Sequence, residues 1–365
     1  MRFLTQAITL ALLVILSTAS LTEAQSENLA EIVREEVEAM MAQTEFASVS
    51  VAIVERGENA TYHFGRLSDG SGPDDETLYD IGSLTKTHTG LLLALAVSDG
   101  LLALDDPVAL YMPELDPGVF SKNGEHATIR HLATHVSGMP QDLACDAPDQ
   151  TPDALLACFL DHDQSDLVDR LRSMELLSVP GEQYRYSNAA VRLLGLILER
   201  VYETSFDELL TERVFPRTGQ TETYSALTPE QHARWQVGQQ ADGDQAPDAS
   251  MYFNPAGGLK STAPDMGRYM RYYLTSEEPL ARDAVTLLVG DPDGLGRAYI
   301  WNTFRLDTVG QLYHGGGTFG TSAWISIYPE AGLGIFMVTP SVSPTAQADL
   351  NGASNAIIAR LRYDD

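Results

Sequence analysis

The chain reads Ser83-Leu84-Thr85-Lys86 where a strand-like segment, residues 77–81, gives way to a helical one. On a helix this spacing places both side chains on one face, one turn apart. A serine hydroxyl is a poor nucleophile unless a base removes its proton, and lysine serves as that base only when its pKa is lowered. The positive end of the helix dipole favours that lowering, and the Ser83 backbone N–H is available to an oxyanion. The stretch therefore predicts a nucleophile beside its base.

The spacing alone has a simpler interpretation, a helix N-terminus that carries an exposed lysine. The residues that follow argue against it, because they make the helix apolar nearly all round. They are Leu91, Leu92, Leu93, Leu95 and Ala96. Such a helix is central and buried in a globular protein.

Composition indicates a large globular chain. It has 365 residues, of which 44% are hydrophobic and 20% charged, enough for one or two closely joined domains. The formal net charge is −28, so nucleic acid and anionic membrane surfaces are poor partners.

Residues 1–24 are typical of a secretory signal peptide. Arg2 is followed by an apolar run from about Ala7 to Leu16 and by small and polar residues up to Ala24, after which we expect cleavage. The alternative is a membrane anchor, but the run is shorter than the roughly 20 residues that span a bilayer. We expect an exported protein with no stable membrane span once the signal is removed.

Two cysteines, Cys145 and Cys158, flank a polar stretch. In an exported protein they favour one disulfide, and two free buried thiols are the alternative. A metal site is not expected, since two cysteines without spaced histidines make no ligand set. The pair His131 and His135 has Leu132 where the zinc-protease helix motif needs its glutamate.

The order of elements predicts an α/β (α+β) fold with an antiparallel sheet flanked by terminal helices. Strand-like runs occur near both ends of the chain, and helix-rich sequence lies between them. We expect strands at 48–54, 60–64, 298–304, 311–314, 322–328 and 334–339, a first helix over 29–41, a last one over 345–361, and helices at 191–201, 207–214 and 263–274. Residues 25–110 and 290–365 would form the sheet domain and 111–289 an inserted helical region, with the active site between them.

A second polar element is Tyr186-Ser187-Asn188, in a turn just before a helix. The tyrosine can simply pack, and the asparagine can simply cap the next helix. A tyrosine held beside cationic groups can instead have its pKa depressed, and it then relays protons for a Ser–Lys pair.

The third element is His314-Gly315-Gly316-Gly317 at the end of an expected strand. Successive glycines weaken a strand unless something approaches the backbone closely. A substrate laid along this edge would need that approach, and a glycine-rich bend or bulge is the alternative.

Together the three elements resemble the serine β-lactamases and penicillin-binding proteins, in the variant with tyrosine in the second element that is typical of the class C β-lactamase branch. The similarity spans roughly residues 27–362, and within the branch it is greatest to the AmpH-type carboxypeptidases and endopeptidases. Supporting stretches are Leu104-Asp105-Asp106-Pro107-Val108, His131-Leu132-Ala133-Thr134-His135-Val136-Ser137-Gly138 and Pro255-Ala256-Gly257-Gly258-Leu259-Lys260-Ser261-Thr262. The resemblance implies a β-lactamase/transpeptidase-like fold and no cofactor.

The resemblance also implies roles. Ser83 would be the acyl-forming nucleophile, Lys86 its proton partner and Tyr186 the base or relay. Asn188 would bind the substrate amide, and the glycine strand, Gly316 and Gly317, would bind substrate, with the Ser83 and Gly317 N–H groups as oxyanion hole. His314 and Gly315 replace the usual lysine and threonine, so we expect turnover of carboxylate substrates to fall as His314 loses its proton, near its ordinary pKa of about 6.5.

The expected function is therefore a periplasmic or secreted serine hydrolase that opens D-alanyl amide bonds in cell-wall peptides. Class C-type β-lactamase or esterase activity on the same fold is an alternative, and a non-catalytic penicillin- or peptide-binding module is another. The expected ligands are a small peptide, a β-lactam or an ester, with peptidoglycan as a further candidate partner.

Overall fold

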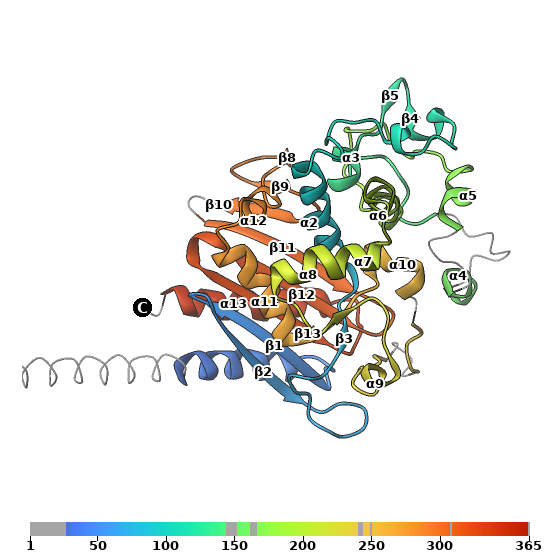
Figure 1. The fold of residues 1–365 in the computed structure, drawn as a ribbon. Helices are drawn as coiled ribbons and strands as arrows, with labels where there is room; N and C mark the ends of the chain where they lie inside the picture. The colour runs from blue at the N-terminus through green and yellow to red at the C-terminus, as the bar shows by residue number, and fades with distance from the viewer. Residues whose placement is uncertain are drawn as a thin grey trace, which may run out of the picture.

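The computed structural model describes residues 27–143, 152–160, 166–239, 244–248, 250–306 and 309–363 (Figure 1). The expected signal peptide and Cys145 lie outside these residues. Among the described helices, none combines the length and apolar character that a membrane span requires.

One antiparallel sheet joins both ends of the chain, as the sequence predicted. Its strand order is β2-β1-β13-β12-β11-β10-β9-β8. Strand β1 pairs with its hairpin partner β2 on one side and with β13 on the other, in the register Ser50↔Val338. The strands are β1 Ser48–Glu55, β2 Glu58–Gly65, β8 Val289–Gly290, β9 Leu295–Arg297, β10 Asn302–Leu306, β11 Val309–Gly317, β12 Ser322–Tyr328 and β13 Leu333–Thr339.

Helices cover both faces of the sheet. The helix over residues 27–41 and α13 (Ala346–Tyr363) share a buried apolar cluster with β1 and β13. On the other face α11 (Ala263–Thr275) contacts β1, β2 and β13, and it crosses in front of the sheet in Figure 1. The terminal helices thus flank the sheet as expected, whereas the division into 25–110 plus 290–365 and 111–289 stays a prediction.

The remaining elements lie between β2 and β8 in the sequence. They are β3 Tyr79–Asp80, α2 Thr85–Ser98, β4 Ser121–Lys122, β5 Glu125–His126, α3 Ile129–Ala133, α4 Pro152–Leu160, α5 Leu167–Leu171, α6 Asn188–Tyr202, α7 Phe206–Leu209, α8 Phe215–Thr218, β6 Thr223–Tyr224, α9 Pro229–His232, α10 Ser250–Gly257, β7 Lys260–Ser261 and α12 Pro279–Asp283, with a π-helical segment at Leu210–Val214 and short 3-10 turns at Gly82–Leu84, Val108–Tyr111 and Pro117–Phe120.

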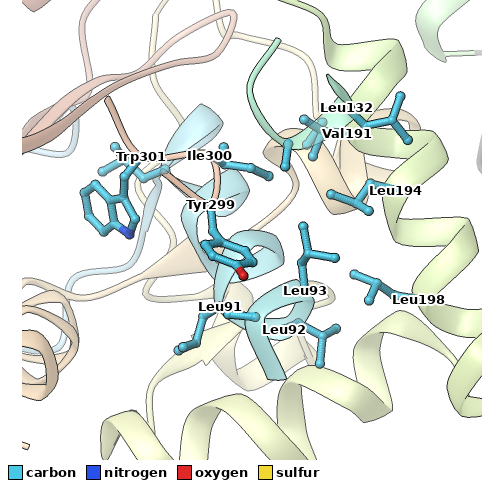
Figure 2. Packing of buried hydrophobic residues seen from close by; sticks show 14 of the residues in the cluster. Leu91, Leu92, Leu93, Leu132, Val191, Leu194, Leu198, Tyr299, Ile300 and Trp301 are labelled. Atoms are coloured by element: carbon cyan, nitrogen blue, oxygen red, sulfur yellow. The ribbon is translucent and has the colours of Figure 1, made fainter. Parts of the chain in front are cut away.

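Helix α2 is the centre of the larger core, as its apolar sequence predicted. Leu91, Leu92 and Leu93 are all buried, and Figure 2 shows Leu93 between Tyr299 and Leu198 of α6. Each such side chain contributes about 1.5–3 kcal/mol relative to an exposed one. The residues that open this helix, on which the Ser–Lys pair lies, are therefore held on a rigid element.

The expected strand at 298–304 is wrong in its first half. Residues 298–301 form a buried turn against α2, with Ile300 at φ 69°, and the strand begins only at Asn302. A Cβ on Gly90 of α2 would lie 2.1 Å from the Tyr299 carbonyl oxygen. Glycine at 90 thus allows the turn to approach the helix, a tertiary requirement that strand propensity does not reveal.

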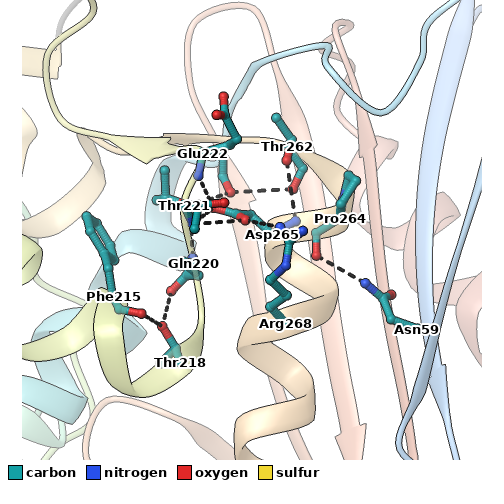
Figure 3. Close-up of polar contacts among 12 residues, drawn as sticks. Asn59, Phe215, Thr218, Gln220, Thr221, Glu222, Thr262, Pro264, Asp265 and Arg268 are labelled. Atoms are coloured by element: carbon teal, nitrogen blue, oxygen red, sulfur yellow. Dashed lines mark hydrogen bonds and ion pairs between the residues drawn. The ribbon is translucent and has the colours of Figure 1, made fainter.

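The strand-like segment at 77–81 contains β3, which belongs to a small three-stranded sheet, β3-β7-β6. Its partners β6 and β7 were not predicted, since each has only two residues. Figure 3 shows the polar cluster that supports it. Asp265 of α11 is fully buried and accepts hydrogen bonds from the backbone N–H groups of Thr221 and Glu222 and from the Thr223 hydroxyl. These bonds tie α11 to β6, which in turn pairs with β7.

Candidate active site

Ser83 lies in the 3-10 turn Gly82–Leu84 between β3 and α2, rather than within the helix itself. Gly82 has φ +50°, and a Cβ there would meet the backbone of Gly317 at 2.6 Å. A Cβ on Gly316 would lie 2.3 Å from the Ile81 carbonyl oxygen. The backbone that closely approaches these glycines is thus the chain's own, which corrects our expectation that a substrate explains the whole run.

Three candidate side chains meet at the Ser83 hydroxyl. Lys86 Nζ donates a hydrogen bond to Ser83 Oγ at 2.9 Å, and the Tyr186 hydroxyl donates to the same oxygen at 2.7 Å. Tyr186 comes from a turn 103 residues along the chain. Tyr186 reaches Ser83 and Lys86 only through the fold, so the meeting of these three side chains is a tertiary contact.

Lys86 is fully buried, and burial lowers its pKa to about 7, an effect that the charge of Asp142 partly opposes. Its Nζ also donates to the Ala256 carbonyl oxygen. The lowered pKa agrees with the sequence argument, although desolvation rather than the helix dipole is its main cause. When neutral, this amine has a lone pair that can accept the Ser83 proton.

Tyr186 differs from the expectation. Burial raises its pKa above the ordinary value, although Lys86 Nζ lies 5.0 Å from the centre of its ring. The depressed pKa that we expected is wrong, because desolvation outweighs the hydrogen bond to Ser83, which lowers the pKa of Tyr186. Tyr186 is therefore a neutral phenol, suited to give a proton to a leaving group rather than to remove one from Ser83.

The turn before α6 is held by His135, which has φ 58°. The His135 carbonyl accepts from the Arg185 N–H at 2.7 Å, its Nδ1 accepts from the Ser187 N–H at 3.2 Å, and its ring lies 4.8 Å from that of Tyr186. Ser187, not Asn188, caps α6, by accepting from the Ala190 N–H. The histidine motif therefore positions the second element.

Asn188 is oriented by a residue that the sequence did not single out. Its Nδ2 donates to Asp142 Oδ1 at 3.0 Å, and its backbone N–H donates to the Gln141 carbonyl oxygen at 2.7 Å. Gln141 and Asp142 follow the 131–138 motif closely, and this proximity was the one signal that could have indicated them.

His314 corrects a second expectation. It is buried, and its pKa is lowered to about 4, by desolvation first and then by the charge of Lys86. Its Nδ1 donates to the Gly315 carbonyl oxygen at 2.7 Å. The ring is therefore neutral at neutral pH, and the expectation that His314 loses its proton near pH 6.5 is wrong.

A cavity of about 280 Å³ opens beside Ser83. Strand β10 pairs with β11 as far as Asn302↔Tyr313, and beyond Tyr313 the edge of β11 contacts the turn that holds Ser83. The lining residues are Asp80, Ser83, Gln141, Asp142, Phe159, Asn188, Pro247, Asp248, Phe253, Ala256, Gly257, Gly317, Thr318 and Phe319. An acyl group bound to Ser83 would have this cavity at its side, with the Ser83 and Gly317 backbones next to each other.

Neither histidine of the 131–135 pair is arranged as a metal ligand. His131 Nδ1 accepts the Thr128 N–H within a helix cap. Within the described part of the chain, no three His, Cys, Asp or Glu side chains gather as a metal site requires. Cys158 is disulfide-bonded, and Cys145, the other cysteine, lies outside the described residues.

Comparisons with known proteins show the family of this chain. The family model described as Beta-lactamase matches residues 33–360. A β-lactamase from Providencia stuartii is 30% identical over 243 residues, which are 66% of this chain and 59% of that relative, less than two thirds of its length. The D-alanyl-D-alanine-carboxypeptidase/endopeptidase AmpH of Escherichia coli (strain K12) is 24% identical over 335 residues, 86% of this chain and 84% of AmpH.

Solved structures share the fold. A β-lactamase/D-alanine carboxypeptidase from Yersinia pestis, complexed with citrate, has a TM-score of 0.77 at 22% identity and covers 91% of this chain and 98% of its own. The D-alanine carboxypeptidase AmpC of Burkholderia cenocepacia has a TM-score of 0.75 at 23% identity, covering 92% and 99%. The family match and the shared fold lead to one conclusion: this chain belongs to the Beta-lactamase family and is a serine hydrolase.

Proposed function

We propose that this protein is an exported serine hydrolase that cleaves D-alanyl amide bonds of cell-wall peptides through an acyl-enzyme. The observation that carries the proposal is the junction at Ser83 Oγ, which Lys86 Nζ and the Tyr186 hydroxyl reach at 2.9 and 2.7 Å. Export rests on the signal-like sequence of residues 1–24, and it makes the protein periplasmic or secreted.

The proposed acylation step uses a neutral Lys86 amine as base and a neutral Tyr186 phenol as acid. Neutral Lys86 accepts the Ser83 proton as Oγ attacks the substrate carbonyl carbon, and the backbone N–H groups of Ser83 and Gly317 stabilise the oxyanion. The Tyr186 phenol then gives its proton to the departing amine, and the Lys86 ammonium returns a proton to Tyr186. The C–N bond breaks, an ester on Ser83 remains and the free amine leaves.

Deacylation reverses these roles with water as the nucleophile. Lys86, neutral again, takes a proton from water directly or through Tyr186, and the hydroxide attacks the ester carbonyl. The C–O bond to Ser83 breaks, Ser83 Oγ recovers a proton, and a carboxylic acid leaves. No cofactor enters either half-reaction.

A peptidase needs a group for the carboxylate of the departing D-alanine, and Arg297 of β9 supports this step. Its charge lowers the pKa values of His135 and His314, which places a guanidinium beside the site. Arg297 lies over the Tyr184 ring at 4.4 Å, and its buried Nε has no hydrogen-bond partner among the described residues. We assign the carboxylate contact to Arg297, because His314 is neutral and Gly315 lacks a hydroxyl.

Esterase activity is the second candidate, favoured by the same neutral His314. A site with less positive charge at this position discriminates less against substrates without a carboxylate. A β-lactamase would use the same acylation step. It differs from a peptidase that β-lactams inhibit because its acyl-enzyme is hydrolysed quickly.

The test compares three substrates on purified protein: a D-Ala-D-Ala peptide, nitrocefin and a short-chain nitrophenyl ester. We expect turnover of the peptide, with Arg297→Gln raising its KM far more than that of the ester. Nitrocefin turnover that exceeds peptide turnover would favour a β-lactamase. If the wild-type protein turns over none of the three substrates even at high substrate concentration, and fluorescent penicillin does not label Ser83, the proposal is wrong. The non-catalytic binding module then remains as the alternative.

A further inference from the structure

Tyr186 marks the side of Ser83 on which a leaving group must lie. Its hydroxyl reaches Ser83 Oγ at 2.7 Å, and it is not among the described residues that line the cavity beside Ser83. A general acid has to lie next to the atom that it protonates, so the departing nitrogen of a substrate approaches Tyr186. Side chains that extend outward from Tyr186 therefore contact the leaving group rather than the acyl group.

Tyr184 is connected to Tyr186 through the ring of His135. The centres of the Tyr186 and His135 rings are 4.8 Å apart, and the Tyr184 ring meets the same imidazole edge to face at 6.1 Å. Both distances are those of aromatic contacts. Tyr184 and Tyr186 are only two residues apart, and contact with one imidazole places their rings on the same side of this segment. Tyr184 is thus the next ring after Tyr186 on the leaving-group side.

Arg297 lies over the Tyr184 ring, with its guanidinium carbon 4.4 Å from the ring centre. The described part of the chain gives this guanidinium no carboxylate partner, although the net charge of the protein is −28. The similar pair of Arg213 over Tyr202, at 4.6 Å, has a carboxylate oxygen of Asp99 3.9 Å from the guanidinium. Arg297 therefore keeps its charge available for the carboxylate of a ligand.

Tyr184 also keeps apolar surface available for a ligand. The residue is 51% exposed, so its contacts with His135 and Arg297 leave about half of it open. An exposed ring and a guanidinium 4.4 Å apart offer an apolar surface beside a positive charge. A departing amino acid has the matching pair of features, a free carboxylate and a side chain. The methyl group of alanine covers little of such a ring, whereas a leucine or phenylalanine side chain covers much more.

We propose that Tyr184 determines specificity for the leaving residue, and that the enzyme prefers a C-terminal residue with a large apolar or aromatic side chain and a free carboxylate to alanine. The inference rests on the proposed function, because it specifies the leaving group of the same hydrolysis. Arg297 holds the carboxylate of the departing residue, and its side chain packs on the exposed part of the Tyr184 ring. The nitrogen between these groups takes its proton from Tyr186, as in the acylation step above.

The test compares three peptides that share their acyl group and differ only in the leaving residue: acetyl-D-Ala-D-Ala, acetyl-D-Ala-D-Leu and acetyl-D-Ala-D-Phe. Release of the free amino acid is measured for each. We expect kcat/KM to rise in this order, with about a tenfold difference between the D-Ala and D-Phe peptides, the effect of one aromatic pair. A D-Phe peptide that is cleaved no faster than the D-Ala peptide would overturn the inference.

Variants assign the preference to the Tyr184 ring. Tyr184→Ala should bring the ratio of D-Phe to D-Ala kcat/KM close to one, whereas Tyr184→Phe, which keeps the ring, should preserve the ratio. Tyr202→Ala is the matched control, since it removes the other arginine–tyrosine pair, and the Tyr202 hydroxyl bonds to Asp99 at the end of α2 opposite Ser83. An unchanged ratio in Tyr184→Ala, or an equal loss in Tyr202→Ala, would contradict the assignment.

Arg297→Gln separates the charge from the apolar contact. Both peptides carry a C-terminal carboxylate, so we expect this variant to raise KM for both of them by a similar factor. Most of the ratio between the D-Phe and D-Ala peptides should remain, because the ring is still present. A variant that abolishes the ratio and leaves KM for the D-Ala peptide unchanged would refute the separate roles given to Arg297 and Tyr184.

A binding measurement separates failure of this inference from failure of the proposed function. Ser83→Ala is titrated with D-phenylalanine and with D-alanine, the two leaving groups, which need no turnover. Tighter binding of D-phenylalanine that is lost when Tyr184→Ala is added supports the inference even if no peptide is cleaved, and only the proposed function then fails. Equal binding of the two amino acids refutes the inference even if the peptides are cleaved.

Discussion

Gly82 lies directly against Gly317, so that a Cβ on Gly82 would be 2.6 Å from the Gly317 carbonyl oxygen and 2.7 Å from its nitrogen. This contact places the turn that carries Ser83 beside the last residue of β11. The two N–H groups that we assign to the oxyanion hole belong to Ser83 and Gly317. Their relative position therefore depends on the absence of a side chain at 82.

Gly82→Ala should separate these two segments and weaken oxyanion binding. We expect kcat to fall about 10²–10³-fold, the effect of losing one oxyanion donor. Gly70→Ala is the matched control, because Gly70 also has a positive φ, +86°, but a Cβ there meets nothing within 4 Å. Equal activity of the two variants, measured on one ester substrate, would show that the contact does not matter for catalysis.

The pH dependence should follow Lys86. Below its pKa of about 7, Lys86 holds a proton and cannot accept another, so kcat/KM should fall tenfold per pH unit on the acid side. Since the charge of Asp142 raises the Lys86 pKa, Asp142→Asn should move this limb to lower pH. His314→Gln should leave its midpoint in place, because His314 is already neutral above about pH 4. A midpoint that moves with His314 rather than with Asp142 would contradict this assignment.

Tyr186→Phe should separate substrates by their leaving groups. An amide needs a proton on its departing nitrogen, whereas p-nitrophenolate leaves without one. We expect amide turnover to fall about 10²–10⁴-fold, the range for loss of a general acid, and nitrophenyl ester turnover to fall much less. Equal losses on both substrates would mean that Tyr186 acts on Ser83 and not on the leaving group.

Asp265→Ala should destabilise the protein through β6. It removes a fully buried acceptor of bonds from Thr221, Glu222 and Thr223 and leaves the Arg268 guanidinium without its partner. We expect a loss of about 3–5 kcal/mol in the free energy of unfolding, measured with urea. Asp169→Asn, whose side chain is 85% exposed, should change it by less than about 0.5 kcal/mol. Similar values for the two would refute the role given to Asp265.

The features that were predicted correctly from the sequence are those that local residue patterns control. The apolar run of α2 and the alternating strands at both ends of the chain gave the buried helix and the sheet. The motifs also indicated that Ser83, Lys86 and Tyr186 would meet, and the structure brings them together. Their catalytic roles stay predictions.

The predictions from sequence were wrong where tertiary contacts determine the local structure or the pKa of a side chain. The turn at 298–301 depends on Gly90, the glycines near 316 on the approach of Ile81, and the pKa values of Tyr186 and His314 on burial. Asp142 was missed because its importance comes from its bond to Asn188, 46 residues further along. None of these partners is encoded by spacing along the chain.

The central claim is that Ser83 forms the acyl-enzyme. Mass spectrometry of protein incubated with a penicillin tests it most directly. We predict one added penicilloyl mass, located on the peptide that contains Ser83 and absent from Ser83→Ala. An adduct on another residue, or hydrolysis of substrate that persists at the wild-type rate in Ser83→Ala, would contradict the claim.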